Sequence, residues 1–131
     1  MLILQDIFYN LQINNFFATI GTIKHFGRIT VNILTFCEID ENLFSSDMAV
    51  EYFHTGISNK ADIAILDIDT IFEFEENKSS ACNSKFVSIA VIDDESDYDA
   101  FKNFGIDAWI KLEDISKINE IINLVNKRFL S

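Results

Sequence analysis

The chain has no proline, only four glycines, two cysteines and ten basic residues in its 131 positions. Proline and glycine are the residues that most often build tight turns, so the loops must form largely without them. Cys37 and Cys82 lack the spacing of metal ligands and fit a reduced cytosolic protein, in which each is expected as a buried thiol. These scarcities exclude a disulfide scaffold and a cysteine-based metal site.

Positive charge is also scarce, because ten Lys and Arg residues face twenty-one Asp and Glu residues and leave a net charge of −11. Residues 1–36 carry Asp6 against Lys24 and Arg28, so the remainder of the chain carries −12. Such a balance argues against binding of nucleic acid or of an anionic membrane by this chain.

No apolar run reaches the length of a membrane span, about 18 residues or more. Asp6 interrupts the N-terminal apolar stretch and no basic region precedes it, so no signal peptide is expected. We therefore expect a cytoplasmic protein.

Hydrophobic residues make up 49% of the chain, with thirteen phenylalanines, which excludes a disordered chain and supplies one domain with a core. The most informative stretch is Asp62–Asp69, DIAILDID, in which an apolar block stops at Asp67. A strand buried on both faces of a parallel sheet has this pattern, and ligands gather beyond the carboxyl ends of such strands. Asp67 is therefore placed where an open sheet does its chemistry.

Other segments alternate between strand and helix patterns. The predicted strands are Met1–Leu4, Ile29–Phe36, Ala61–Leu66, Phe86–Ile92 and Ile106–Leu112. The predicted helices lie within Phe8–Phe26, Asp40–Thr55, Thr70–Ser84, Ser96–Phe104 and the segment that Asp114 caps, with Asn77–Ser84 expected as loop. Alternation of this kind predicts an α/β fold, a single doubly wound, five-stranded parallel sheet in one domain, with a third helix that is short or irregular.

The chain resembles, over nearly its whole length, the receiver domains of response regulators in two-component signalling. DIAILDI around Asp67 and the stretch FKNFGIDAWIKLEDISKINEIINLVNKRF carry the resemblance. It implies a single receiver-like domain over 1–131, with a flavodoxin-like strand order 2-1-3-4-5. It also implies that Asp67 is the phosphoacceptor of a phosphorelay, a carboxylate nucleophile that forms an acyl phosphate.

The Mg²⁺ site implied by the resemblance is incomplete in this sequence. Receivers place two carboxylates after the first strand, where this chain has Gln5 and Asp6. Asp6, Asp67 and Asp69 are the candidate metal ligands, and the loss of one anion predicts weak Mg²⁺ binding. No other cofactor is expected.

The phosphoryl contacts are altered as well. A receiver ends its fourth strand with a hydroxyl, but Ala90 stands near that position and Ser88 lies two residues deeper. The lysine of the fifth strand aligns with Leu112, so Lys111 stands one place early. Ser88 and Lys111 remain the candidate phosphoryl contacts.

These departures predict an atypical receiver-like regulatory domain, not an enzyme, that works by protein–protein contact with weak or absent phosphorylation at Asp67. The expected contact surface lies on the fourth helix, fifth strand and last helix, at Tyr98, Lys102, Trp109, Lys111 and Lys117. Its partner would be a signalling protein, such as a histidine kinase or an output protein, and a homodimer is left open. The alternatives are a functional Mg²⁺-dependent phosphoreceiver and a flavodoxin-like module that binds a small molecule.

A second acidic group, Asp93–Asp99, follows the fourth predicted strand. It lacks the spaced ligands and the glycine of a calcium loop. We interpret it as a solvated helix start that Ser96 opens with a capping pattern, because acidic residues favour the first turn of a helix.

Overall fold

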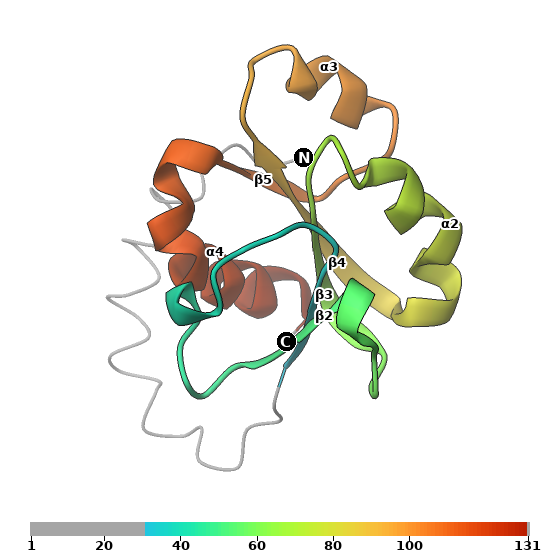
Figure 1. Ribbon diagram of the computed structural model, residues 1–131, viewed down its shortest axis with the longest axis vertical. Coiled ribbons are helices and arrows are strands. Elements are labelled where there is room, and N and C mark those ends of the chain that lie inside the picture. Colours follow the sequence, from blue (N-terminus) through green and yellow to red (C-terminus); the bar gives the residue numbers. More distant parts are fainter. Residues whose placement is uncertain (1–30, 131) are drawn as a thin grey trace.

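The computed structural model describes residues 31–130, which form a five-stranded, all-parallel sheet with helices on both faces (Figure 1). The strands are β1 (Asn32–Thr35), β2 (Ala49–Tyr52), β3 (Ala61–Leu66), β4 (Cys82–Ile92) and β5 (Ala108–Lys111). Their order is β2-β1-β3-β4-β5, and all neighbouring strands are parallel. The predicted flavodoxin-like fold class and its 2-1-3-4-5 order are therefore confirmed.

The α-helices are α2 (Ile71–Ala81), α3 (Asp97–Lys102) and α4 (Ile118–Val125), of which the helix labelled α3 is short. Short 3-10 turns are η2 (Glu41–Leu43), η3 (Phe53–Thr55) and η4 (Leu112–Lys117), and a π-helical turn, η5 (Asn126–Leu130), ends the described chain. In Figure 1, α2 and α4 lie on opposite sides of the sheet. No helix within 31–130 has the length and apolar character that crossing a membrane requires.

The core has two layers because successive residues of each strand point to opposite faces of the sheet. On one face Ile33, Ile63 and Ile65 pack toward α4, and on the other Leu34 and Leu66 belong to a layer that includes residues of α2 and α3. The residues of β3 from Ile63 to Leu66 have no measurable exposure, as expected for a central strand covered on both sides. Both layers hold Asp67 at a fixed edge of the sheet.

Two strands of the sheet differ from the sequence prediction. Asp40–Thr55 was predicted as a helix, and this is wrong: it contains η2, the edge strand β2 and η3. Val50 pairs in register with Ile33 of β1, so an interaction distant along the chain outweighs the local spacing of apolar residues. The predicted strand Met1–Leu4 and helix Phe8–Phe26 lie outside the described residues, and residues 31–130 contain five strands.

The helix boundaries also differ in three places. The Asn77–Ser84 segment is not a loop, because α2 continues to Ala81 and β4 begins at the next residue. Ser96 makes no side-chain capping bond to α3; instead Asp97, which is 8% exposed, accepts the backbone N–H groups of Asp93 and Asp94 at 3.3 and 3.2 Å. The last helix is preceded by η4, and its α-helical part begins at Ile118 instead of at Asp114.

Candidate functional site

Asp67 lies directly after β3 and is half-buried at the carboxyl edge of the sheet. Its Oδ1 accepts hydrogen bonds from the backbone N–H of Thr70 at 3.0 Å and from the Thr70 hydroxyl at 2.9 Å. The backbone N–H of Asp67 in turn donates to Thr70 Oγ1 at 3.0 Å. Thr70 is the residue before α2, so the Asp67 carboxylate closes the turn that starts this helix.

The strand beside β3 brings a thiol, not a carboxylate, to Asp67. Thr35 of β1 pairs with Ile65, and the N–H of Phe36 donates to the Ile65 carbonyl at 2.7 Å, so that Cys37 follows at the level of Asp67. Burial raises the pKa of the Cys37 thiol from 9.0 to about 12, and the charge of Asp67 adds to this increase. Cys37 is therefore a neutral neighbour at neutral pH.

The candidate metal ligands are not gathered in the described part of the chain. Asp6 lies outside the described residues, and Asp69 is exposed in the turn before α2. Within 31–130, no group of three or more His, Cys, Asp or Glu side chains is arranged to hold a metal ion. The residues that follow β1, the first of the described strands, are Phe36 and Cys37, and neither is a carboxylate.

Ser88 lies away from this edge and already has a partner. It is 3% exposed, pairs in register with Ala64, and its hydroxyl donates to Asp107 Oδ2 at 3.1 Å. The N–H of Ser88 donates to the same oxygen at 2.8 Å, and the N–H of Asp107 donates to Ser88 Oγ at 3.1 Å. Because Asp107 directly precedes β5, this network joins β4 to the amino end of β5.

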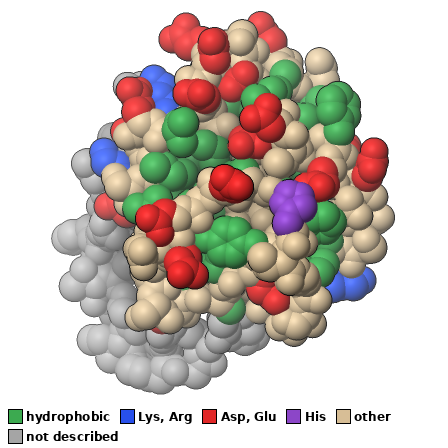
Figure 2. All heavy atoms as spheres, viewed as in Figure 1, with side chains coloured by type: hydrophobic (Ala, Val, Ile, Leu, Met, Phe, Trp, Pro, Cys, Tyr) green, Lys and Arg blue, Asp and Glu red, His purple; other side chains and the backbone are tan. Residues whose placement is uncertain are grey.

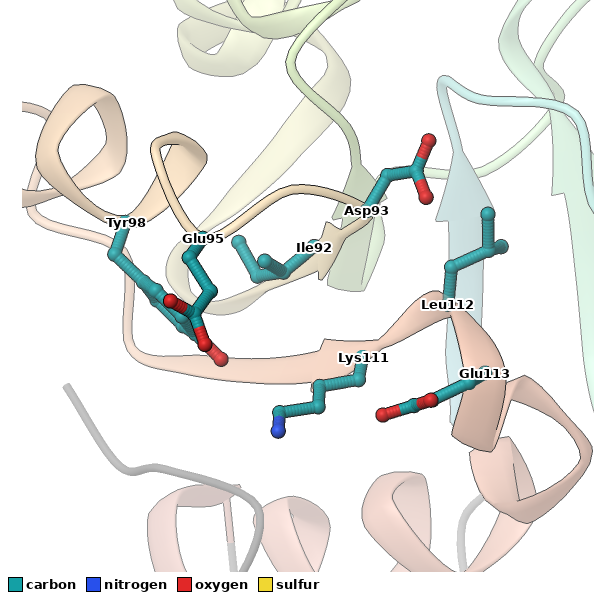
Figure 3. Close-up of a pocket in the computed structure, with 7 residues that line it drawn as sticks. All are labelled: Ile92, Asp93, Glu95, Tyr98, Lys111, Leu112 and Glu113. Atoms are coloured by element: carbon teal, nitrogen blue, oxygen red, sulfur yellow. The ribbon is translucent and has the colours of Figure 1, made fainter.

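Lys111 ends β5 and lines a surface hollow of about 370 Å³ (Figure 3). The other lining residues are Ile92, Asp93, Glu95, Tyr98, Leu112 and Glu113. Asp67 and Ser88 do not belong to this lining. Of the ion pairs within residues 31–130, none joins Lys111 to an acidic group.

The five residues of the predicted contact surface lie on α3, β5 and η4. Tyr98 and Trp109 are half-buried and their ring centroids are 4.1 Å apart. Lys102 pairs with Asp99 at 3.5 Å on the exposed side of α3, and Lys117 is exposed at the end of η4. The structure thus places these side chains on neighbouring elements.

Sequence reasoning missed three features of this region. The Thr70 partner of Asp67 is visible in the sequence as a polar residue three positions later, a spacing typical of side-chain turns. The Cys37 neighbour has no local signal, because it depends on which strand lies beside β3. The hollow, with Glu95, Leu112 and Glu113, likewise needs the register of β4 against β5.

Comparisons of this chain with protein-family models, with curated proteins and with solved structures find no match.

Proposed function

We propose that this protein is an atypical receiver-like signalling domain that acts through protein–protein contact, with weak or absent phosphorylation at Asp67. The sheet order and the position of an aspartate after the third strand support a receiver-like architecture. Fold alone does not determine function, so the proposal depends on the surroundings of Asp67.

The observation that carries the proposal is the pair of neighbours of the Asp67 carboxylate. Thr70 donates two hydrogen bonds to one of its oxygens, and Cys37, which follows β1, is its neighbour from the adjacent strand. Phosphoryl transfer to a carboxylate relies on a cation to neutralise the developing charge, and Mg²⁺ is held mainly by carboxylate oxygens. A site with a neutral thiol in this position binds Mg²⁺ weakly.

The surface of α3, β5 and η4 offers the better-equipped site. It combines the Tyr98–Trp109 ring pair with exposed charged side chains, among them Lys102 and Lys111. Aromatic residues with a polar group are enriched at the centres of protein interfaces, whereas exposed charges form their rims. This composition favours a protein partner over a small-molecule substrate.

The test is an intact-mass measurement after the protein is incubated with Mg²⁺ and acetyl phosphate. We expect the wild-type chain to gain no more phosphoryl adduct than an Asp67→Asn variant. An adduct in the wild type that is lost in Asp67→Asn would show a working phosphoreceiver and overturn the proposal.

A gain-of-function variant makes the same experiment sharper. Cys37→Asp introduces a carboxylate beside Asp67 and Cys37→Asn matches it in size without the charge. If the missing acid limits the site, Mg²⁺-dependent adduct rises in Cys37→Asp only. Circular dichroism spectra of both variants establish that the fold is kept.

A further inference from the structure

The hollow between β4, α3 and β5 has a shape and a charge that select its occupant. Ile92, which is 3% exposed, Tyr98 and Leu112, which is 45% exposed, are its apolar lining residues. A volume of about 370 Å³ is at the lower end of the range for small-ligand sites. The hollow therefore suits one side chain and its neighbours better than a nucleotide cofactor.

Acidic residues outnumber basic residues in the lining of the hollow. Asp93, Glu95 and Glu113 carry three negative charges, and Lys111 carries the one positive charge. Among the ion pairs of residues 31–130, none neutralises any of these three carboxylates. The lining as a whole thus has a net charge of −2, one unit of which comes from Asp93 at the rim, and it attracts a cation.

Four of the lining side chains, those of Glu95, Tyr98, Lys111 and Glu113, approach a common space. In Figure 3, Glu95 and Tyr98 reach from the α3 side toward the region that Lys111 and Glu113 approach from the end of β5. Asp93 points away from that region and lies at the rim. Trp109 contacts the Tyr98 ring at a centroid distance of 4.1 Å and restricts its position.

We propose that this hollow receives an arginine side chain of a protein partner. An arginine has an aliphatic stem that matches the apolar lining and a planar guanidinium that stacks on an aromatic ring and forms paired hydrogen bonds with carboxylates. Tyr98 supplies the ring, and Glu95 and Glu113 supply the carboxylates. This inference rests on the proposed protein-contact function and names the chemistry of its partner.

The experiment is an NMR titration of the whole ¹⁵N-labelled chain with N-acetyl-arginine methylamide. N-acetyl-citrulline methylamide is the matched probe, because it keeps the shape of arginine and lacks its charge. We expect the arginine probe to shift the amide signals of Tyr98, Lys111 and Glu113 and the indole signal of Trp109, and the citrulline probe to leave them unchanged. Equal shifts from the two probes would overturn the proposal, and so would a lysine probe that binds as tightly as arginine.

Substitutions of the lining residues test whether the arginine probe binds in the hollow. Glu95→Gln and Glu113→Gln should each weaken binding of the arginine probe by about threefold, the size typical of the loss of one exposed charge pair. Glu76→Gln, an exposed carboxylate on α2, is the control and should leave binding unchanged. Lys111→Met removes the competing cation and should tighten binding. A Glu95→Gln, Glu113→Gln double variant that binds like the wild type would exclude the hollow.

Failure of the arginine titration can be distinguished from failure of the phosphorylation test. Absence of both an Asp67 adduct and arginine binding would reject the hollow and leave the protein-contact function to another surface. An Asp67 adduct would reject the atypical receiver, whatever the titration shows.

Discussion

The two buried thiols make the stability of the folded protein sensitive to alkaline pH. Burial raises the pKa of Cys37 from 9.0 to about 12 and that of Cys82 from 9.0 to about 11. In the unfolded chain each thiol loses its proton near its ordinary pKa. Between these values the unfolded state binds fewer protons than the folded state, so the free energy of unfolding falls as pH rises above about 9.

We predict that Cys37→Ala removes about half of this alkaline loss. The thiol accounts for a loss on the order of 2 kcal/mol between pH 8 and pH 10.5, because its pKa rises by about three units on folding. Urea unfolding at the two pH values, under reducing conditions, measures the difference. Cys82→Ala should remove nearly as much, since pH 10.5 lies below both raised pKa values. An unchanged pH slope in Cys37→Ala would show that the thiol is solvated.

Single residues also show how far a sequence can predict a site. The position of Asp67 follows from the apolar block before it, because strand and carboxylate adjoin in the chain. The contact of Thr70 with Asp67 follows from their separation of three residues along the chain. The contact of Cys37 with Asp67 cannot be predicted locally, because it requires the pairing of Thr35 with Ile65, thirty residues later in the chain.

Among the elements, α4 is the best example of a helix held by its apolar face. Ile118, Ile121, Ile122 and Val125 are all 2% exposed or less, whereas Asn123 of the same helix is exposed. Positions at steps of three and four form one face of a helix, and tertiary packing of that face gives most of its stability. Asn119 adds a polar link, because its side chain accepts from the N–H of Ser45 at 3.1 Å and donates to the Leu43 carbonyl at 2.8 Å.

We predict that Ile121→Ala lowers the free energy of unfolding by about 2–5 kcal/mol, the range for deleting a fully buried isoleucine. Asn123→Ala is the control on the same helix and should change it by less than about 0.5 kcal/mol. Chemical denaturation at neutral pH measures both. Similar effects of the two substitutions would contradict the packing of α4 on the sheet.

Elements that a local pattern determines were predicted well, and elements that depend on distant partners were not. The β3 strand and the C-terminal helical segment have clear periodicity and were found. The 40–55 segment was assigned wrongly because Val50 forms a strand only beside Ile33 of β1. The polar end of α2 resembled a loop, yet the Lys78–Glu75 pair at 2.8 Å and the buried Ala81 belong to a continuous helix.

Across the whole molecule, acidic residues gather where the strands end. Glu38 follows β1, Asp67 and Asp69 follow β3, Asp94 and its acidic neighbours follow β4, and Glu113 follows β5. The face shown in Figure 2 carries many acidic side chains, with the few lysine and arginine side chains near its margins. Like charges on one side of a folded protein repel one another more than in the expanded chain, so they oppose folding.

This charge distribution predicts that salt stabilises the protein. Raising NaCl from about 20 to 200 mM shortens the screening length from more than 20 Å to less than 10 Å. We expect the midpoint of thermal unfolding to rise by roughly 2–5 °C, which corresponds to on the order of 1 kcal/mol for a domain of this size. Asp69→Asn, at the carboxyl edge, should raise the midpoint at low salt and reduce the response to salt. Glu76→Gln removes the same charge from the exposed side of α2. It should raise the midpoint at low salt by less and reduce the response to salt by less. Equal responses of the two variants would mean that the repulsion is spread over the whole surface and is not concentrated at the carboxyl edge of the sheet.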